Sequence, residues 1–170
     1  MAIFDFFRAD PSSTWPEQQA QLLTLDLWKL SLNGISLGDP ANNLSRLGRP
    51  TNKRPFRAEQ FIYSKLGFVV EIDNHQVCYF GLPVRRREFD EVGPCELQIH
   101  FPDRSTHLVT ETTTADDLLS KLPKPKEIDR DEDETVYFLT LCGKTLELEC
   151  LPDGKVCRIN VFQATSSQLK

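Results

Sequence analysis

Two short helix motifs that lie 75 positions apart constrain the fold of this chain more than any other feature of its sequence. Each begins with a residue that can accept hydrogen bonds from the first free backbone N–H groups, Asp39 in one motif and Thr114 in the other. Each ends at a proline, which cannot continue a helix. The matching pairs are Asp39 and Thr114, Leu44 and Leu119, Leu47 and Leu122, and Pro50 and Pro125. We interpret the motifs as parts of a duplicated unit.

The segments around the two motifs support this interpretation. A hairpin pattern precedes each motif, over residues 30–37 and 97–109, and three strand-like runs follow each, over 61–80 and 136–161. Apolar and polar residues alternate over 146–150, as in an antiparallel strand with one face in the core. The sequence therefore predicts an α+β fold. It would consist of two tandem copies of hairpin, short helix and three antiparallel strands, forming a two-layer antiparallel sheet backed by helices.

The repeat also predicts the organisation of the chain. We expect an N-terminal segment over 1–29, one copy over 30–90, a second over 91–163 and a C-terminal tail over 164–170, with both copies packed as one domain. Residues 16–28 fit either a helix start or a strand. The phenylalanine-rich residues 1–8 are too short for a signal peptide, and we expect them to dock on the core or to contact a membrane or a partner.

Composition narrows the class of protein. Hydrophobic residues make up 39% and charged residues 26%, which is ordinary for a globular protein, and no apolar run is long enough to span a membrane. The net charge of −5 argues against general nucleic-acid binding. The five scattered cysteines form no Cys-x-x-Cys pair. This pattern indicates reduced thiols, and we expect a cytoplasmic protein.

One part of the first motif resembles a known family. The residues Gly34, Gly38, Leu47-Gly48-Arg49-Pro50 and Tyr63 are similar to the repeat unit of the β-lactamase inhibitory proteins, which is related to that of small outer-membrane-assembly lipoproteins. The second motif departs from the pattern, with Leu122-Pro123 in place of Leu-Gly. The resemblance covers roughly residues 30–162. It implies two copies joined in one curved sheet with helices behind it, and a function in binding other proteins.

The sequence contains no phosphate-binding glycine loop, nucleophile elbow, His-Glu-x-x-His motif or EF-hand loop. If Pro102–Ser105 form a four-residue turn, His100 and His107 face each other across a hairpin and could share a metal ion. This leaves open a small metal-dependent hydrolase that uses these histidines. Solvated linkers are the simplest interpretation of the acidic stretch 129–134 and of Arg85-Arg86-Arg87. We expect no cofactor.

The charges of two equivalent segments differ sharply. The segment after the first helix has a net charge of +5 and the segment after the second helix a net charge of −5. Two independently solvated segments are the simplest interpretation. The alternative is that one or both bind a charged partner, or that they pair head-to-tail between two molecules. The candidate binding residues are Arg46, Arg49, Lys53, Arg54, Arg57, Asp129, Asp131, Glu132, Asp133 and Glu134. The favoured function is a non-enzymatic protein-binding module, inhibitor- or immunity-like, and a small-molecule-binding protein is a further alternative.

Overall fold

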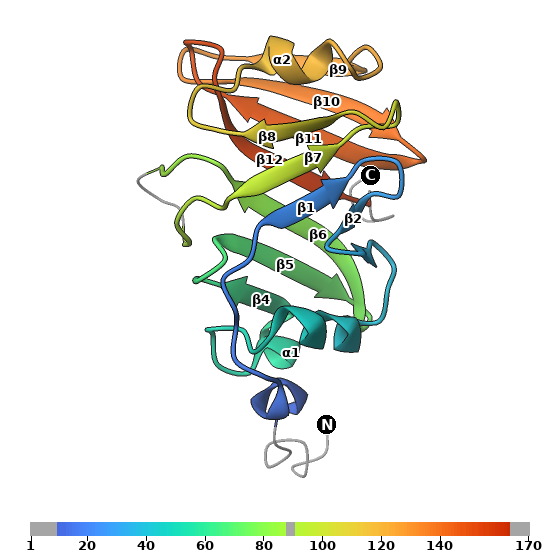
Figure 1. Cartoon of the computed structure of the whole chain (residues 1–170), viewed down its shortest axis with the longest axis vertical. Coiled ribbons are helices and arrows are strands. Elements are labelled where there is room, and N and C mark those ends of the chain that lie inside the picture. Colours follow the sequence, from blue (N-terminus) through green and yellow to red (C-terminus); the bar gives the residue numbers. More distant parts are fainter. Residues whose placement is uncertain (1–9, 88–90, 164–170) are drawn as a thin grey trace.

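Two β-sheets and several short helices make up the computed structural model of this chain, which describes residues 10–87 and 91–163 (Figure 1). The five-stranded sheet contains, in spatial order, β3 (Ile35–Ser36), β2 (Ser31–Leu32), β1 (Leu23–Asp26), β7 (Leu97–His100) and β8 (Thr106–Val109). The seven-stranded sheet contains β4 (Gln60–Tyr63), β5 (Phe68–Asp73), β6 (Gln76–Pro83), β12 (Val156–Phe162), β11 (Lys144–Cys150), β10 (Thr135–Leu141) and β9 (Glu127–Arg130). The helices are η2 (Pro11–Thr14), η3 (Ala41–Leu47), α1 (Pro55–Ala58) and α2 (Ala115–Leu119).

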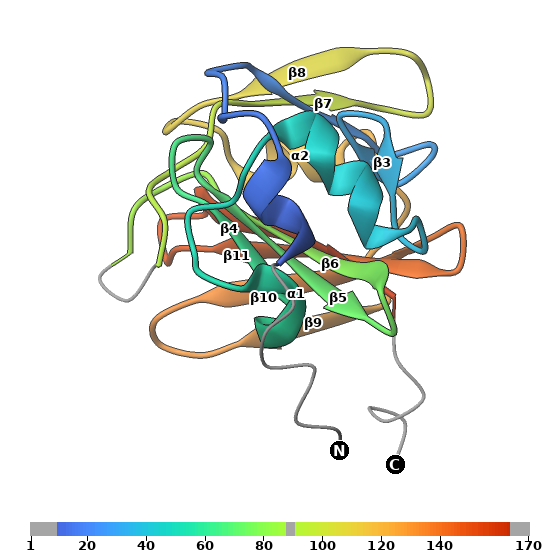
Figure 2. The ribbon, with the colours of Figure 1, turned by 90° about the horizontal axis from the view of Figure 1, so that it is seen from below.

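The two sheets lie in separate layers. The five-stranded sheet covers the middle of one face of the seven-stranded sheet, and η3 and α2 cover that face on either side of it (Figures 1 and 2). Leu44 of η3 and Leu118 of α2 are fully buried in the core between the layers, together with Phe61, Phe68 and Phe80 from the larger sheet. Among residues 10–87 and 91–163, no layer covers the other face of the seven-stranded sheet.

Both sheets join strands from the two halves of the chain. In the smaller sheet β1 runs parallel to β7, with Leu23 opposite Leu97. In the larger sheet β6 runs antiparallel to β12, with Gly81 opposite Asn160. Each half therefore supplies strands to the centre of both sheets, and neither half forms a separate layer.

Several local predictions are confirmed. Asn33 and Gly34 have φ values of 49° and 76° and form the two-residue turn between β2 and β3. Thr114 forms a capping box with Asp117 at the start of α2. The α+β class and the mainly antiparallel sheets are also confirmed. The internal repeat itself stays a prediction.

Other predictions were wrong. The Asp39 carboxylate accepts a hydrogen bond from the backbone N–H of Ser36 and does not cap η3. Residues 16–28 contain strand β1, the strand being one of the two alternatives predicted there, and β1 pairs with β2 across the predicted boundary at residue 29. The acidic stretch is not a linker, because residues 127–130 form β9 and give the second half a fourth strand in the larger sheet. The β1–β7 pair is parallel, and the sheets are therefore not wholly antiparallel.

Gly48 fixes the position of the N-terminal segment. Its φ of 89° lies in the region that favours glycine, and a Cβ atom there would lie 2.8 Å from the Cα of Gln18. The backbone N–H of the next residue, Arg49, donates to the carbonyl of Pro16. The segment that leads into β1 is thereby held against the end of η3.

All five cysteines are free thiols. Among the described helices none is long and apolar enough to cross a membrane. The phenylalanine-rich residues 1–8, for which docking was predicted, lie outside the described residues.

Candidate functional site

The uncovered face of the seven-stranded sheet, which we call the outer face, is built from alternate residues of its strands. On β12 Ile159 and Val161 are buried in the core, whereas Arg158 and Asn160 point the other way. The strand register places the following residues on the outer face: Gln60, Ile62, Val69, Glu71, Tyr79, Gly81, Pro83, Glu127, Asp129, Val136, Phe138, Thr140, Thr145, Glu147, Glu149, Arg158, Asn160 and Phe162.

A chain of hydrogen bonds crosses the outer face from β6 to β11. The Tyr79 hydroxyl donates to Oδ1 of Asn160 over 2.8 Å. The Asn160 amide donates in turn to Oε1 of Glu147 over 2.5 Å and to Oε1 of Glu149 over 2.8 Å. Asn160 thus uses both amide protons on carboxylates, and its side chain is almost completely buried.

Arg87 extends this chain to the turn after β9. Its Nη1 atom lies 3.0 Å from Oε2 of Glu149 and 2.7 Å from Oε2 of Glu134. One guanidinium group therefore bridges two carboxylates that are 15 positions apart in sequence. We call these six residues the Asn160 network: Tyr79, Arg87, Glu134, Glu147, Glu149 and Asn160.

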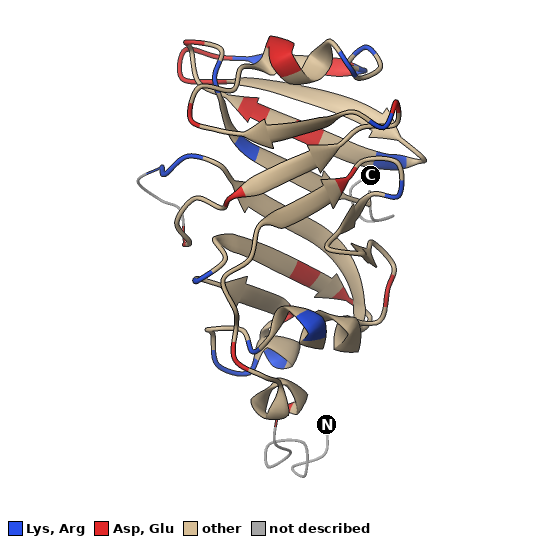
Figure 3. Cartoon of the chain, viewed as in Figure 1, with Lys and Arg blue, Asp and Glu red and all other residues tan. Residues whose placement is uncertain are grey.

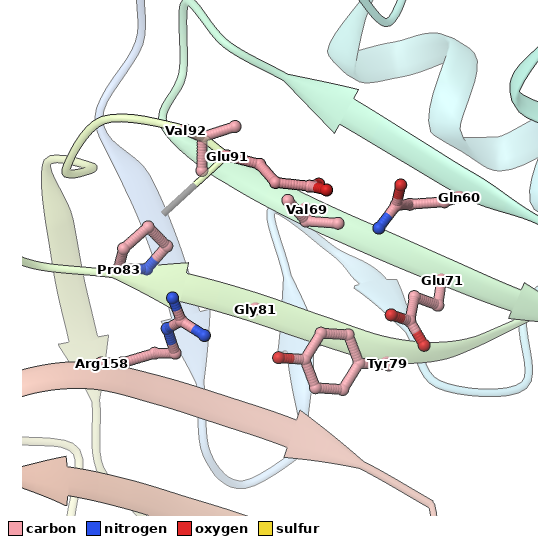
Figure 4. Close-up of a pocket in the computed structure, with 9 residues that line it drawn as sticks. All are labelled: Gln60, Val69, Glu71, Tyr79, Gly81, Pro83, Glu91, Val92 and Arg158. Carbon is pink, nitrogen blue, oxygen red and sulfur yellow. The ribbon is translucent and has the colours of Figure 1, made fainter. Parts of the chain in front are cut away.

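Gly81 makes room for Tyr79 on the outer face. A Cβ atom at position 81 would lie 2.7 Å from the Tyr79 hydroxyl oxygen and 2.8 Å from its Cε1 atom. The aromatic ring therefore occupies the space that a side chain at position 81 would need (Figure 4). The absence of a side chain there allows the Tyr79 hydroxyl to reach Asn160 on the neighbouring strand.

Two adjoining hollows flank the Tyr79 ring. One, of about 170 Å³, is lined by Gln60, Val69 and Glu91 among others, and is shown in Figure 4. The other, of about 320 Å³, extends over β11 and β12. Glu71, Tyr79 and Arg158 line both hollows. The centre of the outer face is therefore indented on each side of an aromatic ring.

The carboxylates of this face are only partly balanced by cations. Burial raises the pKa of Glu149, and Glu147 and Glu134 raise it further, whereas Asn160 and Arg87 oppose the shift. Loss of hydration and the charge of Glu91 raise the pKa of Glu71. A cation brought to this face would lower both pKa values, because it favours the ionised carboxylates.

Tyr79 and Cys78, which line the hollows, do not suit nucleophilic chemistry at neutral pH. Burial raises the pKa of Tyr79 well above its ordinary value. Burial, together with the charges of Glu71 and Asp73, raises the pKa of Cys78 to about 11. Cys78 is therefore a neutral thiol, and the thiolate is the reactive form of cysteine.

The predicted charged segments lie at opposite edges of the seven-stranded sheet. The basic residues Arg46, Arg49, Lys53, Arg54 and Arg57 lie on η3, α1 and the connection between them, beside β4. The acidic residues Asp129, Asp131, Glu132, Asp133 and Glu134 lie on β9 and the turn that follows it. In the ribbon of Figure 3, the end around α1 is mainly blue, whereas the end around α2 and β9 carries many red stretches. The two segments therefore do not meet within one molecule.

Within these segments only Glu134 belongs to the Asn160 network. The network residues Tyr79, Arg87, Glu147, Glu149 and Asn160 were not among the predicted site residues. Glu147 and Glu149 alternate with hydrophobic residues, and this pattern predicted that both lie on the solvent-exposed face of a sheet. No pattern among neighbouring residues indicated that they lie close to Tyr79. Arg87 was predicted to be a solvated linker residue, and this was wrong because it bridges Glu134 and Glu149.

The histidine register was also predicted wrongly. The backbone N–H of Phe101 donates to the carbonyl of Ser105, so the turn contains three residues, with Arg104 at φ 68°. His100 is consequently paired with Thr106, and His107 with Ile99. Because paired residues share a face and neighbours alternate, His100 and His107 point to opposite faces and cannot share a metal ion.

His107 Nε2 lies 3.3 Å from Oγ1 of Thr113, and His100 Nε2 lies 3.4 Å from Oε1 of Gln98. Among residues 10–87 and 91–163, no group of three or more His, Cys, Asp or Glu side chains is arranged to hold a metal ion.

Comparison with known proteins gives no relative from which a function could be transferred: no family model, no curated protein and no solved structure matches this chain.

Proposed function

We propose that this chain is a non-enzymatic protein-binding module, and that its outer face binds a partner protein through lysine or arginine side chains of that partner. The observation that carries the proposal is the Asn160 network. It holds Glu147 and Glu149 on the Asn160 amide and Glu134 and Glu149 on the Arg87 guanidinium, on a sheet face that no layer of the described residues covers.

Electrostatics support a cationic partner. Glu149 is half-buried and Glu71 is more exposed, and the pKa of each is raised. Carboxylates with raised pKa values lower the stability of the fold at neutral pH, because the folded state opposes their ionisation. A partner cation that reaches Glu71 or Glu149 would recover this free energy on binding. Functional surfaces typically contain groups that lower the stability of the free protein and that a bound ligand stabilises.

Apolar side chains around the network suit a protein partner. Val69, Val136, Phe138 and Phe162 lie half-buried on the outer face, between the carboxylates. Protein interfaces combine such apolar contacts with polar groups that fix the orientation of the partner. The family resemblance of residues 47–50 implies protein binding by a sheet as well, and it adds to the proposal as an expectation.

A small cationic ligand is the second candidate. The hollow of about 320 Å³ has carboxylates of Glu71, Glu147 and Glu149 on its walls and the rings of Tyr79 and Phe162 beside them. Ammonium and guanidinium groups bind well to carboxylates and aromatic faces. An ion of the size of agmatine would use the same side chains as a partner arginine.

A peptide titration tests the proposal. We would add the peptide acetyl-Gly-Arg-Gly-Arg-Gly-amide to the full chain, follow backbone amide shifts by NMR, and use the citrulline peptide as the uncharged control. Agmatine serves as the small-cation probe. We expect the arginine peptide to shift signals of β5, β6, β11 and β12. Agmatine that binds at least as tightly as the peptide would favour the small-molecule function.

Two variants of equal charge separate a specific site from general attraction. Glu147→Gln with Glu149→Gln removes two carboxylates of the network, and Glu132→Gln with Asp133→Asn removes two from the turn after β9. We expect the first variant to weaken peptide binding at least tenfold and the second to weaken it less than twofold. Equal weakening by both would refute a specific site on the outer face.

A further inference from the structure

A second exposed surface lies on the other side of the molecule. Large apolar side chains are exposed at four positions among the described residues: Leu22 at 43%, Trp28 at 65%, Leu108 at 53% and Ile128 at 47%. Leu22 directly precedes β1, Trp28 follows β1, and Leu108 lies on β8. Three of the four therefore lie on or next to strands of the five-stranded sheet, whereas Ile128 lies on β9, at an edge of the seven-stranded sheet.

The strand register places Leu108 on the outward side of the five-stranded sheet, and Leu22 and Trp28 lie just beyond the two ends of β1. Leu108 is paired with Gln98, and Gln98 is paired with Thr24, so the three form one row. The neighbouring strand residues Leu23 and Leu97 are fully buried and point to the core. We call the outward side of β1, β7 and β8, with Leu22, Trp28 and Leu108, the Trp28 face.

Trp28 is held in a fixed place at the end of this face. Its backbone N–H donates to Oδ1 of Asp26 over 2.9 Å, and its carbonyl lies 3.6 Å from the Cys142 sulfur. The indole lines a hollow of about 540 Å³ together with Asp26, His100 and Arg104. In a pair of copies, the protruding Trp28 ring of each copy can enter the hollow of the other. Tryptophan in such positions often dominates the free energy of protein association.

Charge distinguishes this face from the outer face of the larger sheet. The strands of the outer face carry five carboxylates, Glu71, Glu127, Asp129, Glu147 and Glu149, and one cation, Arg158. Asp26 is the one acidic side chain that the five strands of the smaller sheet direct outward, and the exposed Glu96 directly precedes β7. Two copies of a chain with a net charge of −5 repel each other less through a face with few carboxylates than through an acidic one.

We propose that the Trp28 face is the interface of a two-fold homodimer of this chain. A two-fold interface brings the same patch of both copies together, so the patch must be compatible with itself. The Trp28 face meets this condition through its exposed apolar side chains, its adjoining hollow and its low charge. Asp26 of each copy can also pair with Arg104 of the other. The acidic outer face then remains free in both copies.

The oligomeric state of the full chain tests this proposal. We would measure the mass by sedimentation velocity between 1 and 200 μM (about the range in which weak dimers form), for the wild type, Leu108→Asp and Ile128→Asp. Leu108 and Ile128 are matched in kind and in exposure, but only Leu108 lies on the Trp28 face. We expect a wild-type dimer, at least tenfold weaker association of Leu108→Asp, and unchanged association of Ile128→Asp.

Tryptophan quenching gives a second measurement that does not depend on the substitutions at 108 and 128. Trp15 is 8% exposed and Trp28 65%, so acrylamide quenching reports mainly on Trp28, and a Trp28→Phe variant gives the signal of Trp15 alone. Quenching should fall as the protein concentration rises. A chain that stays monomeric at 200 μM, with Trp28 fully quenched, overturns the proposal.

Salt separates this interface from head-to-tail pairing of the charged segments. Association through an apolar face should persist in 0.5 M salt, where exposed charges are screened within a few ångströms. Association that disappears at this salt concentration, or that is lost equally in Leu108→Asp and Ile128→Asp, contradicts the proposal. Circular dichroism of each variant shows whether it is folded.

Discussion

The Tyr79 hydroxyl lies 2.8 Å from Oδ1 of Asn160, and the bond joins two residues that are 81 positions apart. It connects the last strand of the first half to the last strand of the second half. Asn160 in turn holds Glu147 and Glu149 at its two amide protons. The neutral amide thus keeps two carboxylates close together on the outer face, and both the stability and the binding of this face should depend on it.

Asn160→Asp should destabilise the fold at neutral pH. The substitution places a third carboxylate between Glu147 and Glu149 and removes both of their hydrogen bonds from position 160. We expect a loss of about 3 kcal/mol, in the range for an unpaired buried charge. Urea unfolding at pH 7 measures the loss, and part of the stability should return on acidification as the cluster takes up protons. Asn42→Asp, at an exposed position, should change stability little.

Gly81→Ala should displace Tyr79. The new methyl group would lie within 3 Å of the Tyr79 ring, so the ring must move and lose its bond to Asn160. We expect a loss of about 1–3 kcal/mol in the free energy of unfolding. Gly93→Ala is the control, because no atom lies within 4 Å of the position of its Cβ. The effects of Gly81→Ala and Tyr79→Phe should not add, and strictly additive effects would contradict the proposed displacement.

The stability of the wild type should fall as pH rises through the titration of Glu149. Its pKa in the folded protein is above the ordinary value of 4.5, so the folded state binds more protons than the unfolded state in the window directly above that value. Glu149→Gln should flatten this part of the profile. Arg87→Gln should raise the pKa of Glu149 further, because it removes the cation at 3.0 Å. Carboxyl carbon shifts measured by NMR would report both effects.

Asn52→Ala should expose the edge of β4. Oδ1 of Asn52 accepts from the backbone N–H of Ile62, and Nδ2 donates to the carbonyl of Gln60. The side chain therefore occupies backbone groups of an edge strand that could otherwise pair with another chain. We expect a loss of about 1–3 kcal/mol and greater aggregation on heating, measured by unfolding and light scattering. Asn42→Ala, which removes an exposed amide, should show neither effect.

Local features of the fold could be predicted from the sequence because they depend on neighbouring residues. The turn at Asn33 and Gly34 follows from their tolerance of positive φ, and the capping box of Thr114 and Asp117 follows from their spacing. Strand positions in the second half follow from alternation. In each case the interactions that stabilise the feature lie within a few consecutive residues.

The candidate site could not be predicted, because its residues meet through strand pairing between distant segments. Asn160 occupies a position on β12 that alternates with buried residues and thus suggests exposure. It is buried because Tyr79, from β6, covers it across Gly81. The histidine register depended on a single residue in a turn, and a shift of one residue moves a side chain to the opposite face. No pattern in the sequence decides such pairings.

The sharing of both sheets between the two halves has a consequence for synthesis on the ribosome. When only the first half has emerged, β1 has no β7 beside it and β6 has no β12, so each sheet has an open edge at what will become its centre. Such edges readily bind other extended chains. Nascent chains of this protein that stop near residue 90 should therefore depend on chaperones or be degraded, although they already contain six of the strands, β1 to β6.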